Sequence, residues 1–207
     1  MFVKEGHRMV YEITFKNSEK FYGEFKFNLI EQNQKKFNHY LYVDKNEKWD
    51  VTTTEIGIPV KVIHTLHGNL IEFYFSEDGR VKMIGKFNNE SIQEERTFKP
   101  GITVENIMVL KNLDFNSTEN YNFDLIQTLE YPKLIAYPMY FRIVGNQKVC
   151  VKAGEFNCKK ILFSLSDMRG LFFRAYYYVT DDLERNIVKI ENMPISGKTE
   201  LISIENN

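Results

Sequence analysis

Two histidines close together in the sequence are the first residues whose spacing could support chemistry. His64 and His67 are separated by two residues. On a strand they face opposite sides, so they cannot share a metal ion unless a turn begins near residues 66–69. We therefore expect no metal site and interpret both as exposed or hydrogen-bonded imidazoles. His39 lies on an apolar strand face and is interpreted as a satisfied core histidine.

The two cysteines, Cys150 and Cys158, could form a disulfide or supply a reactive thiol. They flank a turn predicted at Ala153-Gly154. A two-residue turn there pairs Val149 with Cys158 and places Cys150 on the opposite face, whereas a register shifted by one residue sets the cysteines at a bridging distance. Matching of polar and apolar partners favours the first register, so we expect two free thiols, with a disulfide as the alternative. Neither cysteine has a histidine nearby in the sequence, so we expect no catalytic thiol.

Acidic residues gather in two predicted loops. The first contains oxygen ligands of the kind that bind calcium, at Asp114, Asn116, Glu119 and Asp124. The calcium-loop pattern D-x-[DN]-x-[DN]-G is absent, so a solvated turn is the better interpretation. The second loop, residues 181–185, is interpreted as a turn between strands in which Arg185 can pair with a carboxylate.

Motifs for catalysis or cofactor binding are missing from the sequence. It has no G-x-x-x-x-G-K-[ST] phosphate loop, no G-x-G-x-x-G after a strand, no G-x-S-x-G elbow and no H-E-x-x-H. We therefore expect a protein that is not an enzyme, with no catalytic residues, no cofactor and no metal. The net charge is -1, from 27 basic and 28 acidic residues. This balance argues against nucleic-acid binding, which needs a basic surface.

Alternation of apolar and polar residues predicts strands through most of the chain. In each of four segments, alternate apolar residues share one face of the expected strand: residues 9–15, 21–29, 37–43 and 49–53. No stretch approaches about 18 apolar residues, so we expect no transmembrane helix.

One hairpin can be registered from the sequence. A three-residue loop ending in Gly79 pairs Phe75 with Val81. The same register sets Phe73 against Met83, which places the apolar residues of both strands on one face.

The predicted fold class is all-β: a strongly curved antiparallel sheet, or an open or half barrel, of about 10–12 strands with one short helix. The helix is expected within residues 102–114, where apolar residues recur at helical spacing. A chain of 207 residues fits one unit, and we find no linker, so we expect a single β domain over residues 1–207.

Aromatic side chains are abundant, with 17 Phe and 12 Tyr. They suit a large core, and they also suit a cavity for an apolar ligand. The predicted ligand groove is lined by aromatic residues on strand faces: Phe25, Phe27, Phe73, Phe75, Phe172 and Tyr176. The headgroup of a bound lipid would lie near residues 181–185. The alternative is that the same side chains fill the core completely.

Three stretches together resemble a known family. Residues 6–13 (GHRMVYEI) resemble a G-E-x-L-x-Y opening, and residues 152–159 (KAGEFNCK) resemble P-A-G-x-F-x-C-x-[KR]. Residues 176–185 (YYYVTDDLER) resemble W-x-[ST]-D-D-x-x-R. The family is an uncharacterised group of exported bacterial β-proteins, the domain-of-unknown-function family thirty-one-zero-eight.

The chain departs from this family's pattern at three positions. His7 replaces an acid, and Lys152 and Ile187 each replace a proline. The resemblance implies a curved sheet similar to lipoprotein-carrier half-barrels and no catalytic residues. It also implies export to the periplasm or cell envelope, with the signal peptide missing from this sequence, because residues 1–7 lack a basic region followed by an apolar core. The alternative location is the cytoplasm.

The sequence thus favours a non-catalytic cell-envelope module that binds or carries an apolar ligand: a lipid, an acyl chain or a hydrophobic protein segment. The alternative is a structural or interaction protein of the envelope, with a filled core and no ligand. Such a protein would contact an envelope partner through a sheet edge or a surface patch.

Overall fold

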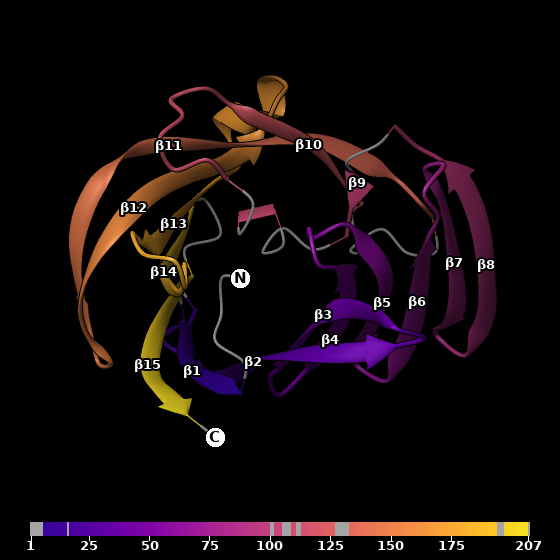
Figure 1. The fold of residues 1–207 in the computed structure, drawn as a ribbon, viewed down its shortest axis with the longest axis horizontal. Coiled ribbons are helices and arrows are strands. Elements are labelled where there is room, and N and C mark those ends of the chain that lie inside the picture. Colours follow the sequence, from indigo (N-terminus) through magenta and orange to yellow (C-terminus); the bar gives the residue numbers. More distant parts are fainter. Residues whose placement is uncertain are drawn as a thin grey trace. The chain divides into compact units, whose positions relative to one another are not determined.

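The structure is a computed structural model that describes residues 6–15, 17–99, 102–104, 109–110, 113–126, 133–193 and 197–206. Strands account for 69% of the described residues and helices for 3%, so the predicted all-β class is confirmed. The strands, shown in Figure 1, are β1 (His7–Thr14), β2 (Lys20–Gln32), β3 (Lys35–Val43), β4 (Glu47–Thr54), β5 (Pro59–Leu66), β6 (Asn69–Phe75), β7 (Arg80–Phe87), β8 (Glu90–Thr97), β9 (Ile102–Thr103), β10 (Tyr121–Ile126), β11 (Ala136–Val151), β12 (Gly154–Leu165), β13 (Arg174–Thr180), β14 (Ile187–Met193) and β15 (Lys198–Asn206). A 3-10 helix, η2 (Met168–Leu171), lies between β12 and β13.

Hydrogen bonds join these strands in the order β8-β7-β6-β5-β4-β3-β2-β1-β15-β14-β13-β12-β11-β10-β9. The first and last strands of the chain, β1 and β15, pair antiparallel along their lengths. Fifteen strands in the described part of the chain exceed the 10–12 expected. The difference arises because β8 is almost wholly polar and β9 is only two residues long, so neither shows an alternating pattern.

The chain forms two compact units, which are described separately. Unit 1 comprises Met1–Lys26, Leu113–Asn122 and Pro138–Asn207, and unit 2 comprises Phe27–Asn112 and Phe123–Tyr137. Strand β2 contributes residues to both. The expectation of a single domain over residues 1–207 stays a prediction.

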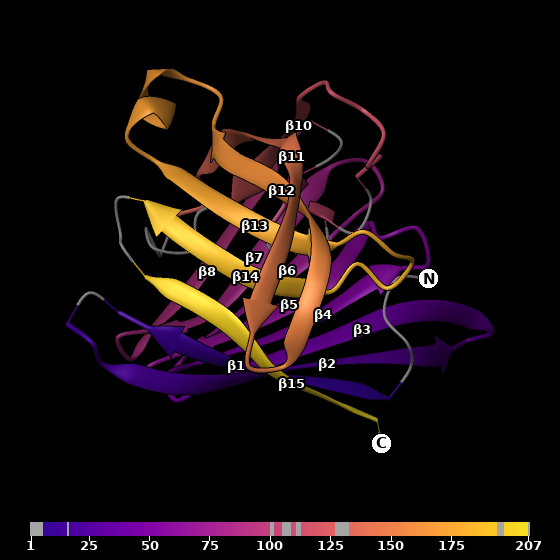
Figure 2. The ribbon, with the colours of Figure 1, turned by 90° about the vertical axis from the view of Figure 1, so that its left-hand side faces the viewer.

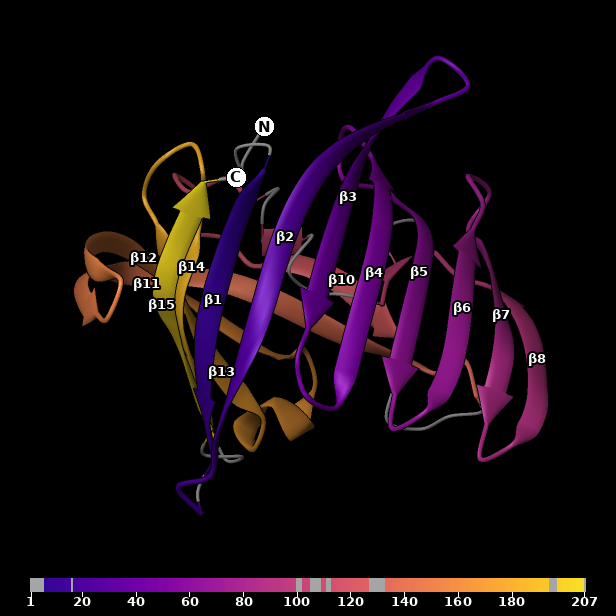
Figure 3. The same cartoon turned by 90° about the horizontal axis from the view of Figure 1, so that it is seen from below.

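Unit 2 contains a meander of antiparallel hairpins from β3 to β8 (Figure 3). Val51 of β4 lies opposite Tyr40 of β3 on one side and Val62 of β5 on the other. Phe73 of β6 continues this row, opposite Val62 and Met83. All five side chains are buried. Directly paired residues point to the same face of a sheet, so these strands share one apolar face.

The hairpin between β6 and β7 has the predicted register, with Phe75 opposite Val81 and Phe73 opposite Met83. Gly79 closes its loop at φ +83. A Cβ atom at this position would lie 2.4 Å from the carbonyl oxygen of Phe98. The turn therefore requires glycine for both its conformation and its close backbone approach.

The predicted inward face of β3 is wrong. The pattern favours the odd-numbered residues of the 37–43 row, whereas the buried residue is Tyr40. Its ring packs against Phe27, with ring centroids 5.0 Å apart. Apolar and aromatic residues occur at both odd- and even-numbered positions of β3, so only the pairing with β4 decides which face is buried.

Of the segment 102–114, in which the helix is predicted, residues 105–108 and 111–112 lie outside the described residues, and residues 102–103 form β9. Val109 and Leu110 are described as helical, and both are buried.

Unit 1 contains β1, β15 and the successive strands β14, β13 and β12, with the long β11–β12 hairpin (Figure 2). Its inward face holds an aromatic cluster. The ring of Phe163 lies 5.0 Å from Phe141 and 5.9 Å from Tyr177, the latter edge to face. Edge-to-face packing favours one fixed arrangement of these rings and so stabilises this end of the unit.

The β11–β12 turn lies one residue earlier than predicted, at Lys152-Ala153. Val151 pairs with Gly154, and Gln147 pairs with Cys158. This shift moves every pair by two residues and leaves the faces unchanged. Cys150 is exposed, Cys158 is buried and both are free, so the prediction of two free thiols is confirmed.

Candidate functional site

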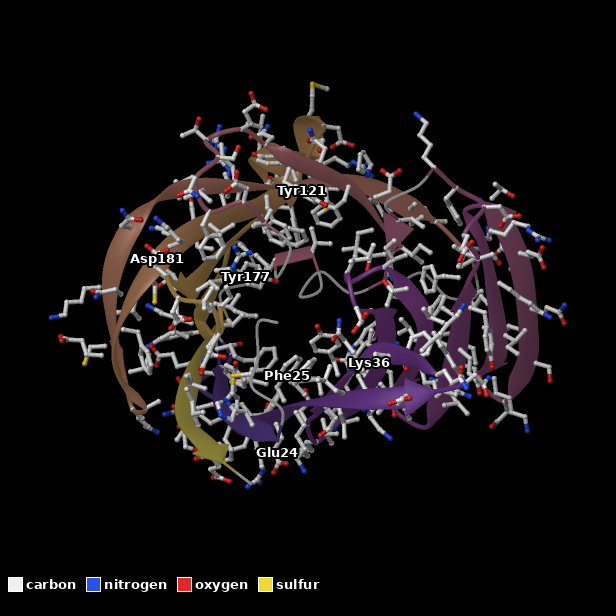
Figure 4. The ribbon with its side chains drawn as sticks, viewed as in Figure 1. Glu24, Phe25, Lys36, Tyr121, Tyr177 and Asp181 are labelled. Atoms are coloured by element: carbon white, nitrogen blue, oxygen red, sulfur yellow. The ribbon has the colours of Figure 1, made fainter. Side chains whose placement is uncertain are left out.

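The inward face of β1 provides the candidate site in unit 1. His7, Met9 and Tyr11 alternate along this face and are 7%, 1% and 6% exposed. Phe25 of β2 lies opposite Met9 and is also buried. We call these four residues the β1 row. Figure 4 shows Phe25 and its neighbour Glu24 on opposite sides of β2, as period-two alternation requires.

The outward face of β1 carries charged side chains that are paired with neighbouring strands. Arg8 forms ion pairs with Glu24 and with Glu205, the latter at 2.5 Å. These outward contacts hold β1 between β2 and β15, because Glu24 and Glu205 belong to its two neighbouring strands. They fix the orientation in which the β1 row faces inward.

Tyr11 closes one end of the β1 row with a satisfied polar group. Its hydroxyl donates a hydrogen bond to the carbonyl oxygen of Ile187 at 3.0 Å. Burial raises the pKa of this phenol far above its usual range, so it stays neutral. Tyr11 therefore presents an apolar ring to the inward face and cannot serve as a base.

His7 occupies the other end of the β1 row and differs from Tyr11. Both of its ring nitrogens are buried, and neither has a hydrogen-bond partner among the described residues. A buried polar group without a partner costs about 1–3 kcal/mol, so native proteins seldom keep one. An imidazole can donate through one nitrogen and accept through the other. His7 thus places a polar group without a described partner at the end of a buried apolar row.

The six residues predicted to line a ligand groove are divided between the units. In unit 2, Phe27 and Phe73 are buried, at 2% and 0% exposed, and Phe75 is half-buried. In unit 1, Phe25 belongs to the β1 row. The two remaining residues, Phe172 and Tyr176, do not share its face.

Phe172 and Tyr176 are displaced from the predicted face for different reasons. Phe172 is 76% exposed, because η2 occupies the segment where the pattern predicts the start of a strand and β13 begins only at Arg174. Tyr176 is next to the inward-facing Tyr177 on β13 and so lies on the other face of the strand. There it packs against a buried cluster that includes Tyr178 and Val188, and the ammonium of Lys160 lies 4.6 Å from its ring centroid.

Tyr178 belongs to a buried cluster in unit 1 with Val149, Cys158 and Val188, which we call the Tyr178 cluster. The Tyr178 hydroxyl donates to Glu191 at 2.8 Å, and the ammonium groups of Lys160 and Lys189 each lie 5.5 Å from its ring centroid. Burial, followed by the hydrogen bond to Glu191, raises the pKa of Tyr178. These interactions stabilise this side of the sheet in unit 1 and engage the polar groups of Tyr178, Glu191 and the two lysines.

Of the three other histidines, His64 and His39 have structural partners. His64 is buried, accepts or donates at 2.6 Å to a carboxylate oxygen of Glu47, and stacks on Trp49 with centroids 3.8 Å apart. His39 bonds Asp50 at 2.8 Å. His67 is exposed in the β5–β6 turn. No group of three or more potential metal ligands occurs among the described residues.

Both acidic segments contain turns held by their own side chains, although Asp124, predicted in the first loop, lies in β10. The Asp114 carboxylate accepts from the backbone N–H of Asn116 at 2.9 Å. In the other loop, Asp182 accepts from the backbone N–H groups of Glu184 and Arg185, at 3.0 and 2.9 Å. Both loops therefore use carboxylates for turn formation.

Arg185 reaches from the β13–β14 turn to the segment that precedes β10. Its guanidinium donates to the carbonyl oxygen of Leu113 at 2.6 Å and lies 4.2 Å from the ring centroid of Phe115. Burial lowers its pKa. Arg185 therefore fastens the β13–β14 turn to the segment that precedes β10.

Neither cysteine is positioned as a nucleophile. Burial, with smaller contributions from Asp182 and Asp181, raises the pKa of the Cys158 thiol to about 12. A thiol with such a pKa is almost never ionised near neutral pH and reacts poorly. Cys150 lies on the opposite face, exposed to solvent.

In the sequence, His7 stands out only as a departure from a family pattern, and it is not predicted as a site residue. The available signal is its place at the head of the apolar row that continues through Met9 and Tyr11. That spacing alone assigns His7 to the buried face of the strand. The lack of a partner depends on neighbours distant in the sequence and cannot be read from the chain.

No protein-family model and no curated protein matches this chain. Among solved structures, it is similar to the β-barrel-like protein of the domain of unknown function DUF1849 from Brucella abortus. The TM-score is 0.57 and the identity 11%, with 96% of each chain covered. This likeness shows the fold alone. Membership of family thirty-one-zero-eight is not confirmed.

Two further structures align over nearly the whole chain at lower TM-scores. A putative exported protein with a YmcC-like fold from Bacteroides fragilis has a TM-score of 0.43 and 12% identity, covering 100% of this chain and 98% of that chain. A putative lipoprotein from Parabacteroides distasonis has 0.41 and 12%, covering 99% and 97%. In the described part of this chain, no helix is long and apolar enough to cross a membrane.

Proposed function

We propose that this protein is a non-catalytic binding or carrier module of the cell envelope for an apolar ligand with a polar end, such as a lipid or acyl chain. The observation that carries the proposal is His7. It is a buried imidazole at the end of an apolar row, and neither of its nitrogens is hydrogen-bonded to any residue that the structure describes. A carboxylate or phosphate on the ligand would supply the missing partner.

The rest of the β1 row suits the apolar part of such a ligand. Met9 offers a flexible thioether, and Phe25 and Tyr11 offer aromatic faces. Each Å² of apolar surface buried on binding contributes about 25 cal/mol, reduced by the cost of immobilising the chain. The ligand would therefore gain affinity from the apolar residues and orientation from His7.

The test is a titration of the protein with a fluorescent fatty acid and with the long-chain alcohol of equal length as competitor. We expect saturable fatty-acid binding that His7→Leu weakens at least about tenfold, since a charge-assisted hydrogen bond is worth about 1.5–3 kcal/mol. The alcohol should lose less affinity than the fatty acid, because its hydroxyl makes only a neutral hydrogen bond to the imidazole. Phe25→Asp should abolish binding of both compounds.

Tyr22→Ser is the matched control, because Tyr22 lies on the same strand as Phe25 and its side chain is 58% exposed. Circular dichroism must show that each variant remains folded. Absence of saturable binding in the unmodified protein would reject the carrier proposal and leave the structural or interaction role.

A further inference from the structure

The turn between β12 and β13 exposes a compact group of large apolar side chains. Met168, Leu171 and Phe172 are 84%, 68% and 76% exposed. All three lie within five residues of sequence, on and just after η2, and Figure 2 shows this segment projecting beyond the ends of β12 and β13. We call these three side chains the η2 tip. Large exposed apolar groups that cluster in this way mark interaction sites.

The backbone beneath the η2 tip is held rigidly. The Ser164 hydroxyl hydrogen-bonds the carbonyl oxygens of Gly170 and Phe173, at 3.1 and 2.7 Å. A Cβ atom on Gly170 would lie 2.2 Å from the carbonyl oxygen of Leu165, so glycine alone permits this close approach. Asp167 caps η2 by accepting from the Arg169 N–H at 2.9 Å. The exposed apolar groups are thus presented by an ordered turn.

The neighbouring residue Phe173 anchors this turn to the core of unit 1. Its ring packs edge to face against Phe163, with centroids 5.7 Å apart. Phe172, next to it, faces solvent. Consecutive aromatic residues therefore have opposite roles, one fastening the turn and one extending from it.

Charge around the η2 tip favours an anionic partner. Arg174 lies two residues after Phe172 and is exposed, and its guanidinium Nε lies 3.4 Å from the Gly170 carbonyl oxygen. Arg169 lies in η2 between Met168 and Leu171 and pairs with Asp167 at 2.5 Å. Two arginines against one aspartate leave one net positive charge beside three apolar side chains.

We propose that the η2 tip docks the protein on an anionic lipid bilayer, with Met168, Leu171 and Phe172 entering the boundary between headgroups and acyl chains. Arg174 would then lie at the level of the phosphates. A bilayer accepts a projecting apolar tip without shape complementarity, and basic residues beside apolar ones strengthen such binding. A protein partner would require a matched surface of about 800 Å² on each side, which three side chains do not supply.

Vesicle cosedimentation tests this proposal independently of ligand binding. The unmodified protein should bind vesicles of phosphatidylcholine and phosphatidylglycerol at 3:1, and bind phosphatidylcholine vesicles more weakly. The triple variant Met168→Ser, Leu171→Ser, Phe172→Ser should lose at least about tenfold in partitioning, since membrane binding scales with buried apolar area. Arg174→Gln should weaken binding only to the vesicles that contain phosphatidylglycerol.

The matched control replaces three other highly exposed apolar residues, as Ile56→Ser, Ile58→Ser and Leu183→Ser, which are 72%, 54% and 81% exposed in the native protein. This control should bind vesicles as the unmodified protein does. Failure of the unmodified protein to bind, or an equal loss in the control, would overturn the proposal. Self-association that only the η2-tip variant abolishes, without vesicle binding, would overturn it in favour of a protein contact.

Discussion

His64 in unit 2 and His7 in unit 1 are both buried on an inward strand face, yet their surroundings differ. His64 lies opposite Ile71, in the row that continues to Phe73, and it bonds Glu47 and stacks on Trp49. His7 heads a similar apolar row, and neither of its nitrogens has a hydrogen-bond partner within the described ranges. The same residue type in the same kind of row is thus structural in one unit and a candidate ligand contact in the other.

The largest expected effect comes from replacing one packed phenylalanine in the row of His64 and one in the β1 row. Phe73→Ala should lower the free energy of unfolding by about 3–5 kcal/mol, because it opens a cavity around a side chain that is fully buried. Fatty-acid affinity, measured under conditions where the variant is folded, should stay unchanged. Phe25→Ala should weaken that affinity instead. If both substitutions weaken binding equally, the assignment of binding to the β1 row is wrong.

Replacing each of the two histidines should give the next largest effects, which are changes of opposite sign in the free energy of unfolding. His64→Leu should destabilise the fold by about 1–3 kcal/mol, since it leaves the Glu47 carboxylate without its partner. His7→Leu should stabilise the ligand-free fold by about 1 kcal/mol, because it removes an unpaired buried polar group. Urea denaturation monitored by tryptophan fluorescence measures both. Destabilisation by His7→Leu would show that His7 is a packed core residue.

These contrasts indicate what the sequence can and cannot predict. The 21–29 row and the β6–β7 hairpin could be predicted because alternation and a glycine turn are local signals. The buried face of β3 could not be predicted, because apolar residues occur at both odd- and even-numbered positions. Only the pairing with β4 decides which set is buried. The β1–β15 pairing joins opposite ends of the chain, so no local pattern predicts it.

The outward face of β1 allows a smaller test, through pH. Hydrogen bonds from Lys152 and Lys20, at 2.7 and 3.0 Å, lower the pKa of Glu12. Because the folded pKa lies below the unfolded value, the ionised carboxylate stabilises the fold above about pH 4.3, and this stabilisation is lost as the pH falls through the folded pKa.

Glu12→Gln should therefore flatten the acid side of the curve of unfolding free energy against pH, whereas Glu55→Gln, at an exposed turn, should not. Fatty-acid binding should persist in both variants, because neither residue belongs to the β1 row. An unchanged acid side in Glu12→Gln would mean that the Lys152 contact does not stabilise the fold.

The smallest effect concerns the two thiols, which should differ in their reactivity toward a thiol reagent. In the native protein, a thiol reagent should modify Cys150 alone, because Cys158 is buried and its pKa is raised to about 12. After denaturation without reductant, two thiols should react. Two fast thiols in the native protein would show that the Tyr178 cluster, which contains Cys158, opens readily. No reactive thiol after denaturation would show a disulfide.

The most direct test of the central claim is native mass spectrometry of the protein purified from its original host, with His7→Leu produced in parallel. We predict that the unmodified protein retains an adduct with the mass of a lipid or fatty acid and that His7→Leu loses most of it, while His64→Leu, if folded, retains it. Unmodified protein without any adduct, or equal loading of the unmodified protein and His7→Leu, would contradict the assignment of His7 as the polar contact of a ligand.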